Sequence, residues 1–178
     1  MINSTPTRRL TTAALCVAIG VLLPQLFHPI PNFSSIFLPM HLPVLICGLI
    51  CGWKYGMLCG ILCPVLSFAL AGMPPAFILP GMVCELAVYG LASGLIFARI
   101  HTGSMVKNVY FALIPAMLLG RLFAGLVDGL IFRVGQYTFQ IFISGLFVTA
   151  LPGILVQLVL IPLLIVVLTK AKVIQHTA

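Results

Sequence analysis

Apolar runs of about 20 residues recur along most of this 178-residue chain. Wound as a helix, a run of that length spans the ~30 Å hydrocarbon core of a bilayer. With 62% hydrophobic and 6% charged residues, the sequence predicts an all-α integral membrane protein. The chain is expected to form one domain over residues 1–178, with no soluble domain and no sequence repeat. Six spans are expected, at about residues 9–27, 37–52, 55–70, 77–98, 108–132 and 141–168.

The lysines and arginines predict the orientation of these spans. With the N-terminus in the cytoplasm, only Arg133 falls outside, and Arg121 lies within a span. This asymmetry favours six helices with both termini cytoplasmic. It also explains the net charge of +7 without a nucleic-acid partner. The seven inner cations are Arg8, Arg9, Lys54, Arg99, Lys107, Lys170 and Lys172.

The only two acidic residues, Glu85 and Asp128, both fall inside predicted spans. A charged side chain at the bilayer centre costs roughly 2.5–3.5 kcal/mol on insertion scales, so it normally faces a cavity or a partner. At 1.5 Å per residue, Glu85 lies roughly 12 Å deep and Arg121 lies at a similar or slightly greater depth. Asp128 is expected nearer the outer surface.

Spacing predicts which of these residues face the same way. Arg121 and Asp128 share one helix face, and Glu85 and Tyr89 share another. The hypothesis is that both faces line one outward-opening cavity. A structural ion pair between Glu85 and Arg121 without a ligand is the main alternative, and a short proton relay is a weaker one.

The cysteines and one histidine allow further alternatives. The pairs Cys47/Cys51 and Cys59/Cys63 are each spaced i, i+4, and four thiolates could hold Zn²⁺. Interleaved glycines instead favour a small-residue packing seam. A secreted disulfide framework is not expected, since all six cysteines lie in apolar runs. His41 is either a donor in the pocket or a hydrogen-bonded cap.

Enzyme signatures are missing from the sequence. The chain has no G-x-x-x-x-G-K-[ST], H-E-x-x-H or G-x-S-x-G, so it contains no P-loop with which to use ATP. An ion-driven secondary transporter or a small channel is one alternative function. A structural subunit of a membrane complex is another.

Four features together resemble the substrate-binding S component of energy-coupling factor (ECF) transporters. One is the arginine-containing start with Ala14-x-x-x-Ala18. The others are the stretches LPMHLPVL at 38–45, LSFALAGMPP at 66–75 and ELAVYG at 85–90. The resemblance covers essentially the whole chain, and its most specific part runs from the second to the fourth predicted span.

The resemblance implies a multi-pass protein of a bacterial cytoplasmic membrane that binds a vitamin or related micronutrient from outside. Ala14 and Ala18 would contact a transmembrane coupling subunit (EcfT-like) driven by two ABC ATPases. No cofactor is expected in this chain, because ATP and Mg²⁺ belong to those ATPases. Transport would involve toppling in the bilayer. Topology adds four loop residues as possible ligand contacts: Asn32, Gln136, Tyr137 and Gln140.

The ligand class is narrowed by the residues themselves. The start Met1-Ile2-Asn3 lacks the N-terminal His expected of nickel and cobalt members, and Trp53 lies at an inner turn, away from any thiamin site. A buried carboxylate can accept two hydrogen bonds from an N–H/NH₂ edge, which favours a purine-like or pterin-like base. Arg121 could instead bind the carboxylate of a pantothenate-like acid.

Overall fold

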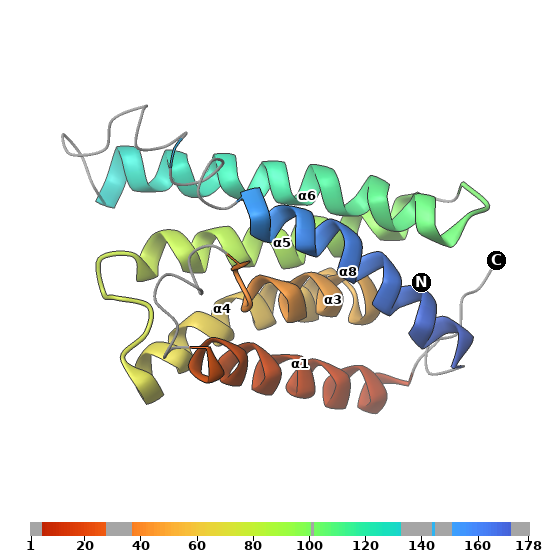
Figure 1. The fold of residues 1–178 in the computed structure, drawn as a ribbon, viewed down its shortest axis with the longest axis horizontal. Coiled ribbons are helices and arrows are strands. Elements are labelled where there is room, and N and C mark those ends of the chain that lie inside the picture. Colours follow the sequence, from red (N-terminus) through yellow and green to blue (C-terminus); the bar gives the residue numbers. More distant parts are fainter. Residues whose placement is uncertain (1–4, 28–36, 101, 133–143, 145–150, 172–178) are drawn as a thin grey trace.

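All regular structure in the described part of the chain is helical (Figure 1). The computed structural model describes residues 5–27, 37–100, 102–132, 144 and 151–171. These residues form six α-helices and a π-helical turn, η1, that continues α6. The elements are α1 (Pro6–Leu26), α3 (His41–Cys51), α4 (Trp53–Ala71), α5 (Leu79–Arg99), α6 (Met105–Val127), η1 (Asp128–Phe132) and α8 (Leu151–Lys170).

Five of these helices are long and apolar enough to cross a membrane: α1, α4, α5, α8 and α6 with most of η1. The sixth, α3, has 11 residues. Its length is therefore about 16 Å, roughly half of the hydrocarbon core.

The predicted helix over 37–52 is wrong at its start. Phe37 is helical, but Leu38 takes a left-handed backbone with φ 52° and separates it from α3. Pro39 explains the break, because a residue before proline is disfavoured in the right-handed helical region. The predicted turn at Trp53–Lys54 is also displaced, since Gly52 alone, with φ 95°, makes the turn and Trp53 opens α4.

The other boundaries agree more closely. The starts and ends of α1, α4 and α5 lie within three residues of the prediction, and α6 begins three residues earlier. The predicted continuous helix to residue 132 becomes π-helical from Asp128. The last span was predicted from residue 141, and residues 141–143 and 145–150 lie outside the described residues.

Helix α5 is the centre of the bundle and packs against α3, α4 and α6. Glycines allow this close approach: a Cβ at Gly60 would overlap the Leu86 carbonyl oxygen, and one at Gly56 would overlap that of Gly90. A Cβ at Gly48 would lie 2.6 Å from the same Gly90 oxygen. The predicted small-residue seam is therefore confirmed at these three glycines.

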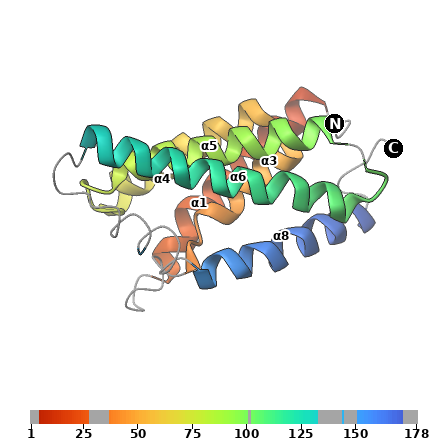
Figure 2. The same ribbon diagram turned by 90° about the horizontal axis from the view of Figure 1, so that it is seen from above.

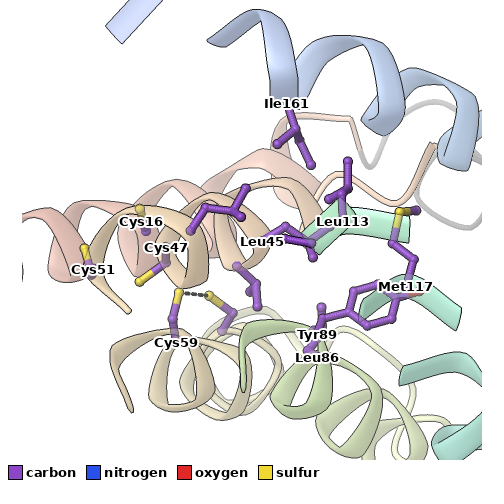
Figure 3. Close-up of a cluster of buried hydrophobic side chains, with 14 of the residues drawn as sticks. Cys16, Leu45, Cys47, Cys51, Cys59, Leu86, Tyr89, Leu113, Met117 and Ile161 are labelled. Carbon is purple, nitrogen blue, oxygen red and sulfur yellow. Dashed lines mark hydrogen bonds between the residues drawn. The ribbon is translucent and has the colours of Figure 1, made fainter. Parts of the chain in front are cut away.

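Cysteine thiols fill the core beside this seam. Cys16, Cys47 and Cys59 come together from α1, α3 and α4 (Figure 3), and all three are buried. The Cys59 and Cys63 sulfurs are 3.7 Å apart, and all six cysteines are free thiols. Among the described residues, no three His, Cys, Asp or Glu side chains are arranged to hold a metal ion. Here the cysteines act as small apolar side chains.

Several helix ends and connections lie together at one end of the bundle. Helix α1 begins and α8 ends at the same end, beside the α5–α6 connection (Figures 1 and 2). Arg9, Gly52, Lys54 and Ala98 line one small cavity there, which places the α3–α4 turn at this end too. The chain therefore leaves α1 at the opposite end and returns through α3.

Candidate functional site

A buried ionic cluster lies where α3, α5 and α6 meet. Glu85 Oε1 is 3.6 Å from His41 Nε2 and 3.9 Å from Arg121 Nε. The three residues are 8%, 1% and 2% exposed. Glu85 lies about 9 Å inside the start of α5, and the short α3 begins at His41 beside it. The structure thus brings together two predicted partners, Glu85 and Arg121. It also places His41 beside them, the residue that the sequence left as either a pocket donor or a cap.

Tyr89 completes the cluster one turn farther along α5. Its ring meets the His41 ring edge to face, with centroids 5.4 Å apart and an interplanar angle of 70°. The same ring packs against Gly120, where a Cβ would overlap its Cδ1 and Cε1 atoms. Gly120 precedes Arg121, so the absence of a side chain there lets α6 bring its arginine beside Glu85.

The polar atoms of this cluster are close but poorly satisfied. Glu85 Oε1, both His41 ring nitrogens and the Tyr89 hydroxyl are buried without a hydrogen-bond partner among the described residues. The two ion-pair distances exceed the usual 2.7–3.2 Å of a hydrogen bond. Buried polar groups in proteins are nearly always hydrogen-bonded, so each exception needs an explanation. The cluster has donors and an acceptor available for a polar ligand.

Asp128 lies apart from the ionic contacts of Glu85. A Cβ added to Gly81 would overlap the Asp128 carboxylate, so this carboxylate rests on the first turn of α5. The N-terminal end of a helix carries partial positive charge and favours an anion. Asp128 is half-buried and shares the inward side of α6 with Arg121 and Gly125, as the spacing predicted.

Gln157 was missed by the sequence analysis. It is fully buried in α8, and neither its amide nitrogen nor its amide oxygen has a hydrogen-bond partner in the described part of the chain. One turn along α8, Ile161 points toward Leu113 of α6 (Figure 3). The signal was present, because Gln157 is the one polar side chain between Leu151 and Val167.

The remaining predicted residues divide into two groups. Ala14 and Ala18 are both exposed on α1, where a second helix could approach them. The loop residues lie outside the described residues: Asn32, Gln136, Tyr137 and Gln140.

Comparisons with known proteins agree with the resemblance seen in the sequence. No curated protein and no solved structure matched the chain. The family model described as "ECF transporter, substrate-specific component" matches residues 8–165. That match covers all six α-helices except the ends of α1 and α8. Together with the apolar helical bundle, it shows that the chain belongs to the family of substrate-specific components of ECF transporters.

Proposed function

We propose that this membrane protein captures a vitamin or related small micronutrient for an ATP-driven importer. As a substrate-specific component it is a substrate-binding transporter subunit and not an enzyme. The observation that carries the proposal is the cluster of Glu85, His41, Tyr89 and Arg121. In it, Glu85 Oε1, both His41 ring nitrogens and the Tyr89 hydroxyl have no hydrogen-bond partner among the described residues. A polar ligand would supply the hydrogen-bond partners that these atoms lack.

The composition of the cluster favours a heterocyclic ligand. The Glu85 carboxylate accepts hydrogen bonds, so it suits an N–H/NH₂ edge, while Arg121 donates to a carbonyl or ring nitrogen on the same ligand. A purine-like or pterin-like base offers both kinds of group in one plane. A pantothenate-like acid ranks second, because its carboxylate would bind Arg121 but it offers fewer hydrogen-bond donors to Glu85.

Outer-loop residues would complete the pocket above this cluster. The proposed contacts are Asn32, Gln136, Tyr137 and Gln140, and Asp128 would lie nearest to them. In this arrangement the ligand enters from the end of the bundle opposite the start of α1, and Glu85 marks the bottom of the pocket.

Transport in this proposal depends on partners. The chain would be a multi-pass protein of the bacterial cytoplasmic membrane, with both termini in the cytoplasm. An EcfT-like transmembrane coupling subunit would pack on Ala14 and Ala18, whose exposure allows close helix contact. Two ABC ATPases would hold the ATP and Mg²⁺, because this sequence has no P-loop. Toppling of the bundle would then turn the pocket toward the cytoplasm.

Native mass spectrometry of the gently purified protein tests this proposal. We expect a bound small molecule at one per chain, with a mass that identifies it. Purified protein should also gain thermal stability from members of a nucleobase, pterin and vitamin panel. Glu85→Gln and Arg121→Met should remove that gain while the protein still folds. Binding of acids alone, without any heterocycle, would reverse the order of ligand classes.

Ser93→Ala is the matched control. Ser93 is a buried polar residue on α5 that donates to the Gly90 carbonyl at 3.3 Å, two turns beyond Glu85. It should bind ligand like the unaltered protein. Two results together would instead identify the cluster as a structural ion pair. The unaltered protein would fold but bind nothing in the panel, and the Glu85→Gln variant would fail to fold.

A further inference from the structure

An apolar trough runs along the side of the bundle formed by α1, α3 and α8. It has a volume of about 490 Å³, which lies in the range of small-molecule sites. Helix α8 stands away from α4 and α5 and runs along this side (Figures 1 and 2). Each helix contributes three aliphatic side chains one turn apart, which makes the trough straight. They are Leu15, Ile19 and Leu23 from α1, Leu42, Ile46 and Ile50 from α3, and Leu160, Leu164 and Leu168 from α8.

One end of this trough is positively charged. Arg8 and Arg9 line it at the start of α1, and Thr12 follows one turn further along. Arg9 also lines the adjoining cavity of about 220 Å³, which contains Lys54. The trough is therefore apolar along its length and positively charged at the end where α1 begins.

We infer that this trough binds an anionic phospholipid. One acyl chain lies along the aliphatic side chains, and the phosphate lies at Arg8 and Arg9. A guanidinium group can donate two parallel hydrogen bonds to a phosphate. In a zwitterionic headgroup the phosphate already has a cation beside it, so its attraction to arginine is weaker. Leu15 to Leu23 covers about 12 Å of helix, close to the ~15 Å depth of one hydrocarbon leaflet. The site thus matches a lipid from the leaflet at which α1 begins.

A packed helix from another protein fits this trough less well. Helices approach each other closely through small residues. The alanines of α1, Ala14 and Ala18, do not line the trough. Its walls are mainly leucine and isoleucine, with Cys16, Pro43 and Cys51 among them. The two faces of α1 therefore suit different partners.

Lipid titration of the full-length protein, read by native mass spectrometry, tests the inference. The probes are dioleoylphosphatidylglycerol, dioleoylphosphatidylcholine and glycerol phosphate. We expect phosphatidylglycerol to bind at least tenfold more tightly than phosphatidylcholine. The reason is that each basic residue near an anionic lipid strengthens binding about fivefold. Glycerol phosphate alone should bind weakly, because it lacks the acyl chains. Equal binding of both lipids, or tight binding of glycerol phosphate, would overturn the inference.

Paired variants locate the site. Arg8→Gln with Arg9→Gln should reduce the preference for phosphatidylglycerol about tenfold. Arg99→Gln with Lys107→Gln removes the same charge from exposed positions that do not line the trough, and should change it little. An equal loss in both pairs would mean diffuse attraction to a cationic surface and would contradict a defined site.

Photo-crosslinking gives an independent readout of the apolar part. A phosphatidylglycerol with a diazirine in its acyl chain should label peptides of α1, α3 and α8. Labelling spread evenly over the exposed faces of α4 and α6 would overturn the placement.

The native mass spectra also report whether the protein forms dimers. If a dimer dissociates in the Leu160→Trp variant while lipid binding is unaltered, the trough binds a second copy of the chain and not a lipid.

Discussion

The residue that shapes the site most is Glu85, because its charge is held at membrane depth by two neighbours from other helices. His41 and Arg121 approach the same carboxylate oxygen, at 3.6 and 3.9 Å. Removing one partner of a buried ion pair is costly, since the other charge remains buried, whereas replacing both by apolar or neutral groups is often close to neutral. The stability of single and double variants therefore measures how strongly the pair is coupled.

We predict a large interaction between the Glu85 and Arg121 substitutions. Glu85→Ala should lower the free energy of unfolding by about 3–5 kcal/mol, because Arg121 loses its carboxylate neighbour in a buried site. Glu85→Ala combined with Arg121→Met should recover most of that loss. Thermal and denaturant unfolding in detergent, arranged as a double-mutant cycle, provides the numbers. Simple additivity of the single effects would show that the two side chains are not energetically linked.

Asp128 is predicted to affect stability and not ligand affinity. Its carboxylate rests on Gly81 in the first turn of α5, so Asp128→Asn removes a favourable charge from a helix N-terminus. The expected loss is about 0.3–1 kcal/mol. Ligand affinity, measured by calorimetry with the molecule identified by mass, should stay within about twofold. If Asp128→Asn lost ligand binding without losing stability, Asp128 would belong to the pocket. That is the position that helix periodicity alone predicts for it.

At the scale of the helices, the glycine seam holds α4 and α5 at a separation that tolerates no added carbon. We predict that Gly60→Ala destabilises the protein by about 1–3 kcal/mol, because the new methyl group overlaps the Leu86 carbonyl and forces the helices apart. Ala69→Val is the control, since it adds more volume on an exposed position of the same helix. Thermal unfolding in detergent compares the two. Equal midpoints would show that the seam can relax at little cost.

Helices were the part of this fold that the sequence could predict, because long apolar runs and turn residues are local signals. The start of α3 was missed for a local reason too: the run continues through Leu38, and only the rule for residues before proline marks the break. The π-helical turn at Asp128 has no such local signal. Its carboxylate meets Gly81, a residue far away in the sequence, and that contact depends on how α5 and α6 pack.

At the scale of the whole molecule, the site was only partly predictable. The sequence analysis predicted that Glu85, Tyr89, Arg121 and Asp128 face one cavity, since charges at membrane depth are few and conspicuous. The structure brings the first three together and places the Asp128 carboxylate against Gly81. The position of His41 depended on the length of α3, which brings the helix start to the level of Glu85. Gln157 was visible in the sequence but became informative only once α8 was seen to turn it inward.

The arrangement of charge along the bundle leads to a last prediction, about topology. Six described cations belong to the end at which α1 begins: Arg8, Arg9, Lys54, Arg99, Lys107 and Lys170. The positive-inside rule predicts that this end faces the cytoplasm. In the described part of the chain, five helices are long enough to span a membrane. The shorter α3 nevertheless returns the chain to this end, because Gly52 and Arg9 line one cavity. We therefore expect an even number of crossings.

Reporter fusions measure this directly. A fluorescent protein fused after Ala178 should fluoresce, and alkaline phosphatase at the same position should be inactive. Phosphatase fused after Pro75, in the connection between α4 and α5, should be active, because that connection lies at the opposite end. An active phosphatase after Ala178 would mean an odd number of crossings. In that case α3 and the segment before it would not cross the bilayer, and His41 would not reach Glu85 from the outer side.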